Sequence, residues 1–202
     1  MSGTGSDLWW TLTLPDVTAE LVEQVLALAE QSGLSPRHPD GHLNGFDHEG
    51  ERRLLTRDEL INGMVTGEWS TNLWDRAAMD IGPSTRYQRL MLSQDAVHHG
   101  GSRELITELW VAIAEATHSS AVSRTNGRSS RSGPGSPPVG TLPEWLSWST
   151  YFDAERTENL PQLAAALGAD VRRTPSGASV ITLPGEIDAL RFARLHLAYV
   201  TG

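Results

Sequence analysis

Two spacings of hydrophobic residues open the chain and predict its first elements. Over residues 8–14 (LWWTLTL), leucine and tryptophan occupy every second position on one face, a period of two that is typical of a β-strand. From Val17 the apolar residues recur every three to four positions until Gly33 interrupts them. This spacing predicts an amphipathic helix, with Asp16 as the candidate N-cap.

The middle of the chain alternates between the same two patterns. Thr56 and Glu59 have the spacing of a capping box, which predicts a short helix from Arg57 that ends at Gly67. Three short runs with a period of two follow and predict a three-stranded meander: residues 69–74, 77–81 and 87–92, divided at 75–76 and at 82–84. A second long helix is expected to begin after Ser102 and to end near His118.

The end of the chain predicts shorter elements. A second capping-box spacing at Thr141 and Glu144 precedes residues 145–151, and a proline-led stretch at 161–167 predicts another short helix. We expect a hairpin from residues 171–174 and 178–183, joined by 175–177, and a closing helix over 186–200. Strands clustered between helices favour an α+β fold with an antiparallel sheet packed by helices.

Two segments lack either period and predict loops. Residues 35–50 gather proline, glycine, histidine and aspartate, which is typical of an exposed loop. Residues 119–140 hold seven serines, four glycines and three prolines among 22 positions, which predicts a flexible loop. Because the roughly 60 residues beyond it are few for an independent core, we interpret residues 1–202 as one domain that carries this loop.

Composition narrows the class of partner. The 202 residues include no cysteine, so disulfides, thiolate zinc sites and cysteine nucleophiles are excluded. The formal net charge is -9, and the first 60 residues contribute -7 of it, from eleven acidic residues against four arginines. An acidic chain is repelled by nucleic acid and anionic lipid, so we expect a basic protein partner. Nothing in the chain matches a membrane span or a signal peptide, which predicts a cytoplasmic protein.

Catalytic and metal-binding patterns are weak. The loop over residues 40–49 holds His42, Asp47 and His48, donors that could serve a metal-dependent hydrolase together with His98 or His99. A solvated acidic loop explains the same residues, and the histidine pair before the second long helix matches no phosphate-binding loop. No nucleophile elbow is present. We therefore predict no catalytic residues, no resident metal and no cofactor.

Tryptophan is abundant, at seven residues against three tyrosines and three phenylalanines. Trp10, Trp69 and Trp110 lie within apolar patterns and are predicted to be core residues. Trp145 and Trp148 form a pair that could anchor a partner, with core packing as the alternative.

The end of the chain resembles the C-terminal part of the immunity protein 52 family of bacterial polymorphic-toxin systems. The resemblance lies in residues 145–152 (WLSWSTYF), the short helix predicted after them, the strand 177–183 (GASVITL) and the terminal helix. The earlier order of elements is similar as well, and a group of type VI secretion immunity proteins shares these signatures. The resemblance implies a cytoplasmic protein without catalytic residues that binds and neutralises a cognate toxin, commonly a nuclease with a restriction-endonuclease-like domain.

The two lines of reasoning together predict a partner-binding surface. We expect acidic residues to attract the basic toxin and the tryptophan pair to contact it: Asp40, Asp47, Glu49, Glu51, Trp145 and Trp148. The alternatives that remain open are the small metal-dependent hydrolase and an accessory subunit of a larger assembly.

Overall fold

The computed structural model describes residues 8–14, 16–74, 80–86, 89–94, 103–125, 149–154 and 168–182. The helices in these ranges are α1 (Ala19–Gln31), α2 (Arg57–Thr66) and α3 (Arg103–Thr117). The strands are β1 (Leu8–Thr13), β2 (Leu43–Phe46), β3 (Arg52–Leu55), β4 (Leu73–Trp74), β5 (Asp80–Arg86), β6 (Arg89–Gln94), β7 (Ser120–Thr125), β8 (Ser149–Phe152), β9 (Asp170–Arg173) and β10 (Ser179–Thr182).

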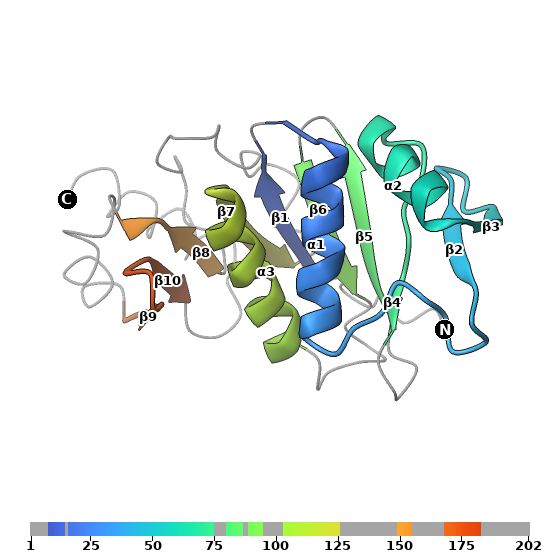
Figure 1. Ribbon diagram of the computed structural model, residues 1–202. Coiled ribbons are helices and arrows are strands. Elements are labelled where there is room, and N and C mark those ends of the chain that lie inside the picture. The colour runs from blue at the N-terminus through green and yellow to red at the C-terminus, as the bar shows by residue number, and fades with distance from the viewer. Residues whose placement is uncertain are drawn as a thin grey trace, which may run out of the picture.

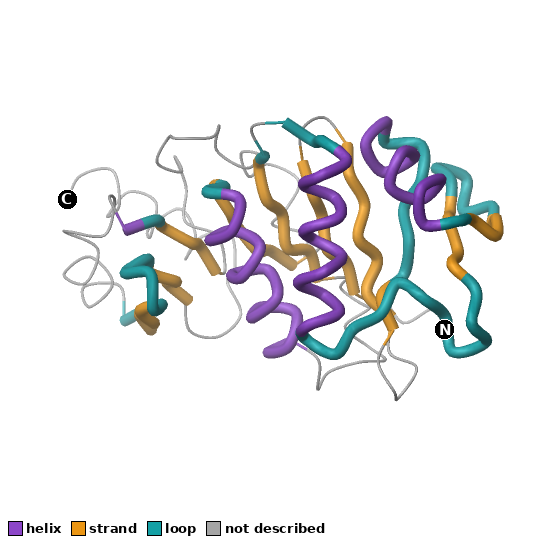
Figure 2. Tube along the Cα trace, viewed as in Figure 1, coloured by secondary structure: helices purple, strands orange, loops and turns teal. Residues whose placement is uncertain are grey.

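Helices cover one face of a long antiparallel sheet. Within the described ranges, eight strands join in the order β4-β5-β6-β1-β7-β8-β10-β9, and β2 and β3 form a separate pair. Helices α1 and α3 lie side by side over the middle of the sheet, while α2 and the β2-β3 pair lie at one end (Figure 1; Figure 2). The predicted α+β fold with an antiparallel sheet packed by helices is confirmed. Within the described ranges, no helix has both the length and the apolar character needed to cross a membrane.

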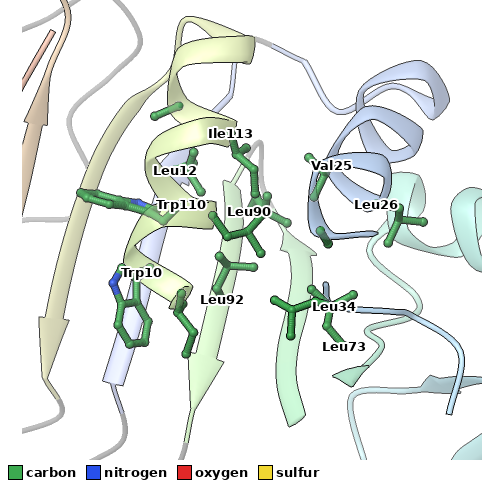
Figure 3. Close-up of a cluster of buried hydrophobic side chains, with 14 of the residues drawn as sticks. Trp10, Leu12, Val25, Leu26, Leu34, Leu73, Leu90, Leu92, Trp110 and Ile113 are labelled. Carbon is green, nitrogen blue, oxygen red and sulfur yellow. The ribbon is translucent and has the colours of Figure 1, made fainter. Parts of the chain in front are cut away.

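The core lies between the sheet and the helices. The register of β1 against β6 sets Trp10 opposite Leu92 and Leu12 opposite Leu90, so the alternating residues of both strands meet on the helix side. These four side chains are buried with residues of α1 and α3 (Figure 3). The predicted core positions of Trp10, Trp69 and Trp110 are confirmed.

Two indoles join β1 to α3 in both directions. Trp10 of β1 donates from Nε1 to Thr107 Oγ1 of α3 at 3.2 Å. Trp110 of α3 donates from Nε1 to the backbone oxygen of Thr11 in β1 at 3.3 Å. Each large side chain thereby fills the core and satisfies its one polar atom, which is the usual condition for burying tryptophan.

The starts of α1 and α2 test the capping predictions. In α2 the capping box is present: the Thr56 N–H donates to Glu59 Oε2 at 2.7 Å, and Gly67 ends the helix with φ of 75°. In α1 the N-cap is Thr18, whose hydroxyl accepts from the Leu21 N–H at 3.2 Å. The prediction of Asp16 as the cap was wrong, because the helix begins two residues later than the first apolar residue suggested.

The meander prediction was right in the order of its three strands and wrong in their bounds, since the runs predicted at 69–74, 77–81 and 87–92 form strands at 73–74, 80–86 and 89–94. Strands β4, β5 and β6 pair in sequence, but residues 82–84 lie inside β5 and do not form a turn. The pairing of β4 with β5 covers only two positions and stops at Ile81. From residue 82 onward β5 has β6 as its only strand neighbour among the described residues, and proline is tolerated on such an edge because one side needs no N–H donor.

The predicted loop at 119–140 contains a strand. Residues 120–125 form β7, which is paired on both sides, with β1 and with β8. The prediction rested on the serine, glycine and proline content of the whole segment, which does not show that these six residues form a strand. Residues 126–140 lie outside the described ranges. The second capping box predicted a helix over residues 145–151, but residues 149–152 form β8, because they pair with β7 and β10.

The C-terminal hairpin is confirmed and other expectations fall outside the described residues. β9 and β10 pair through the turn at 175–177, in which Gly177 has φ of 88°. The cap at Ser102, residues 141–148 and the helices expected at 161–167 and 186–200 lie outside the described ranges.

Tyr151 of β8 gives the fold a predicted pH dependence. Burial of the phenol, followed by the charges of Glu115 and Asp153, raises the pKa of Tyr151 to about 12 from an ordinary value of 10.0. Since the folded pKa lies above the unfolded one, the stabilisation is complete below pH 10 and is lost as the pH rises towards 12. We expect Tyr151→Phe to flatten the fall in stability between pH 10 and 12 in denaturant titrations. An equal fall in the variant and the parent would contradict this assignment.

Candidate interaction surface

Residues 35–50, which were predicted to be an exposed loop, contain a buried strand. Leu43, Asn44 and Gly45 of β2 are buried, and β2 pairs along its whole length with β3. The loop prediction was wrong because a four-residue strand that contains asparagine and glycine is too short to show a period. We call residues 37–55, which include this hairpin, the hairpin lobe.

Hydrogen bonds attach the hairpin lobe, and Ser35 just before it in the chain, to the β4 end of the large sheet. Ser35 and Trp74 exchange N–H to oxygen bonds of 2.8 and 2.7 Å, so Ser35 covers the outer edge of β4. Phe46 and Ser70 exchange two bonds of 2.9 Å, and Thr71 Oγ1 donates to the Asn44 oxygen at 2.8 Å. The lobe is therefore a separate two-stranded sheet that isolated bridges hold next to the β4 end of the large sheet.

Trp69 packs between the lobe and α2 in a slot that two glycines leave open. A Cβ placed on Gly63 of α2 would lie 1.7 Å from Trp69 Cδ1, and one on Gly45 of β2 would lie 3.2 Å from Trp69 Cε3. The Arg53 guanidinium lies 5.7 Å from the centre of a Trp69 ring, within the range of a cation–π contact. The indole thus fixes the orientation of the hairpin relative to α2.

The tip of the hairpin brings together three of the predicted residues. Asp47 Oδ1 accepts from the N–H groups of Glu49 at 2.9 Å and Glu51 at 2.8 Å, and Gly50 turns the chain with φ of 85°. The carboxylates of Glu49 and Glu51 are exposed on this turn. Asp47 therefore holds the tip, and Glu49 and Glu51 present its charge to solvent.

Asp40 serves the turn that leads into β2, at the other end of the strand from the tip. Its carboxylate accepts from the His42 N–H at 3.0 Å and lies 2.9 Å from His38 Nδ1. The His42 N–H, together with His38, lowers the pKa of Asp40. Arg52 reaches from β3 to within 3.8 Å of Asp40 Oδ2. Asp40, which was predicted to contact the partner, is therefore engaged within the fold.

Other acidic residues of the first 60 are also engaged. Arg57 of α2 pairs with Glu23 at 2.8 Å and with Glu30 at 3.0 Å, both on α1. The hydrogen bonds that Arg57 donates to these two carboxylates raise the pKa of its guanidinium above the usual range. Glu59 accepts the Thr56 N–H, which lowers the pKa of that carboxyl. Glu49 and Glu51 at the tip are exposed, and Glu49 contacts only His48, at 3.8 Å, among the described ion pairs.

The histidine residues of the lobe do not assemble into a metal site with its carboxylates. Across the described ranges, no group of three or more histidine, aspartate or glutamate side chains could hold a metal ion. His42 and His48 are exposed, and the Asp47 carboxylate is used by the turn. His98, His99, Trp145 and Trp148 lie outside the described residues, so the predictions for them remain predictions.

Sequence reasoning missed a surface on β3. Leu54, with 59% of its area exposed, is the large hydrophobic residue that the described part of the chain leaves in solvent, and the exposed Arg52 and Arg53 precede it. The run RRLL before the capping box was the available signal, but it has no alternation and was not assigned to a strand.

Comparisons with known proteins leave the family open. No family model matches the chain, and no curated protein matches it. A solved structure described as a Pseudomonas aeruginosa T6SS protein, PA0821, is similar, with 17% identity and a TM-score of 0.47 over 96% of this chain and 72% of that chain. Membership of the immunity protein 52 family therefore remains a prediction from the resemblance.

Proposed function

We propose that this chain is an immunity protein that binds a cognate bacterial toxin and neutralises it, and that the hairpin tip contributes to the contact. The proposal includes a basic toxin, of the nuclease class that the resemblance implies, and a cytoplasmic setting. It assigns no catalysis, metal or cofactor to this chain.

The tip of the hairpin lobe is the observation that supports the proposal. Glu49 and Glu51 are exposed on a turn that Asp47 fixes with two hydrogen bonds, so a partner would not have to order this segment on binding. Four other carboxylates of this region are engaged within the fold by Arg57, His38 or the α2 cap: Glu23, Glu30, Asp40 and Glu59. An exposed acidic turn held in this way suits a basic protein surface, because charge complementarity accelerates encounter.

Co-expression with the protein encoded by the neighbouring gene tests the function. We expect this chain to restore growth to cells that produce that protein in their cytoplasm, and to co-purify with an inactive variant of it. Growth arrest despite soluble expression of this chain, together with no co-purification, would contradict the proposal. Metal analysis of the purified chain provides an independent check on the alternative of a hydrolase.

Neutralising the tip is expected to slow association with the toxin. We predict that Glu49→Gln with Glu51→Gln lowers the association rate about tenfold at low salt, with a smaller effect at high salt, because these charges act on the encounter. Asp47 is left intact since it holds the turn. Stopped-flow measurements at two ionic strengths give the readout.

The matched control removes the same amount of charge elsewhere. Glu104 of α3 and Asp170 of β9 are exposed and lie outside the lobe. The double variant Glu104→Gln and Asp170→Asn should leave the association rate within about twofold of the parent. Equal slowing in both double variants would assign the effect to net charge and not to the tip.

A further inference from the structure

The outer edge of β3 carries main-chain hydrogen-bonding groups that no described strand or isolated bridge uses. The Asp47 N–H donates to the Glu51 oxygen at 3.2 Å, which makes 47 and 51 a hydrogen-bonded pair of the β2-β3 ladder. Such pairs alternate along an antiparallel ladder, so Arg53 and Leu55 direct their N–H and C=O groups towards β2. Arg52 and Leu54 direct theirs away from it. Phe46, opposite Arg52, shows the same alternation, because its outward groups bond to Ser70.

No described strand or isolated bridge pairs with this outer edge. β3 has β2 as its one neighbour within the described ranges, and Arg52, Arg53 and Leu54 are all exposed. An edge of this kind can accept a further strand, whose main chain supplies the missing hydrogen bonds. The exposed side chain of Leu54 lies at the same edge and offers an apolar contact.

The arginines decide which strand fits. If two copies of this chain paired through the outward groups of Arg52 and Leu54, Arg53 of one copy would lie directly across from Arg53 of the other. Like charges opposite each other destabilise a pair of strands, so this edge opposes self-association. An acidic segment would instead be attracted to Arg53, which stacks on Trp69 and acts on the Glu59 carboxylate through its charge but forms no ion pair within 4.0 Å in the described part of the chain.

We propose that β3 receives an extended, antiparallel segment of the toxin, in which an apolar residue is followed directly by an aspartate or glutamate. The apolar residue lies across from Leu54, and the carboxylate lies across from Arg53. The main chain of the segment bonds to Arg52 and Leu54. This inference rests on the proposed function and assigns a second, chemically different part of the same contact, next to the acidic tip.

Amide hydrogen exchange in the complex with an inactive variant of the neighbouring gene's product is the direct test. In the free chain, the Arg52 and Leu54 amides should exchange faster than those of Arg53 and Leu55, which bond to β2. In the complex, we expect exchange at Arg52 and Leu54 to slow by at least about tenfold. Arg53 and Leu55 serve as internal references in the same spectra.

Two substitutions at one position separate main-chain from side-chain contributions. Leu54→Ala removes the apolar contact and keeps the N–H, and should weaken binding about tenfold. Leu54→Pro also removes the outward N–H without breaking a bond to β2, and should weaken binding about a hundredfold. Thermal unfolding and the exchange of the β2 amides confirm that each variant retains the hairpin.

The possible outcomes are distinct. A stable complex in which the Arg52 and Leu54 amides remain unprotected would overturn strand addition and leave the proposed function standing. Equal binding by Leu54→Ala and Leu54→Pro would overturn the main-chain contact in the same way. Failure of the two proteins to form any complex would overturn the proposed function and this inference together.

Discussion

Replacing Trp110 by alanine is expected to lower the free energy of unfolding by about 3 to 5 kcal/mol, the range for removing a large aromatic side chain from a core. Trp110 is fully buried between α3 and the sheet, and its indole donates to the Thr11 oxygen. The substitution therefore leaves a cavity and removes the indole N–H of α3 that donates to this oxygen. Urea titrations followed by circular dichroism provide the measurement.

The indole bond itself is isolated by a second substitution. Trp110→Phe keeps an aromatic ring but removes the Nε1 donor, and should cost less than Trp110→Ala. Because Trp10 makes the reverse bond to Thr107, the double variant Trp10→Phe and Trp110→Phe tests whether the two contacts are coupled. A loss below 1 kcal/mol for Trp110→Ala would contradict the assignment of Trp110 to the core.

Replacing Gly63 by alanine should destabilise the protein by about 2 kcal/mol and disturb the hairpin lobe. The new Cβ would lie 1.7 Å from Trp69 Cδ1, so the buried indole must move. Overpacking of this kind costs about 1 to 3 kcal/mol, and the higher helix propensity of alanine returns at most about 1 kcal/mol. We place the penalty at the upper end of its range because Gly45 limits movement of Trp69 on its other side.

A neighbouring position on α2 supplies the control for Gly63→Ala. Asn62 is exposed on α2, so Asn62→Ala gains helix propensity without meeting Trp69. Its stability should equal or slightly exceed that of the parent. Amide chemical shifts of residues 43–55 should change in Gly63→Ala and remain unchanged in Asn62→Ala. A Gly63→Ala protein as stable as the parent would show that the slot for Trp69 is not tight.

The long, regular elements were predictable from the sequence because a buried hydrophobic residue recurs in them at a constant interval. The strand at 8–13 and the helix over 19–31 each place a hydrophobic residue on the core side at every period, so the pattern identifies both. The α2 capping box was predictable for another reason, since Thr56 and Glu59 satisfy each other's main chain locally. In both cases the information lies within a few consecutive residues.

Elements that depend on distant partners were not predictable in this way. β7 is a strand because β1 and β8 lie on both sides of it, and β2 is one because β3 and Ser70 supply its hydrogen bonds. Neither segment shows a period of its own. The same limit applies to the candidate surface: Glu49 and Glu51 could be selected from charge, but the role of Asp47 in holding the turn, and the open edge of β3, follow only from the pairing.

The attachment of the hairpin lobe has an evolutionary consequence. Asp47 holds the turn at the tip. The rest of the lobe is fixed by the main-chain bonds between Phe46 and Ser70 and by the Trp69 indole, which lies between two glycines, while the tip and outer edge face solvent. Main-chain bonds do not depend on side-chain identity, so residues 48, 49, 51 and 54 can be exchanged without repacking the core. A lineage could therefore change the partner that it recognises by substitutions in this one hairpin, with the rest of the molecule preserved.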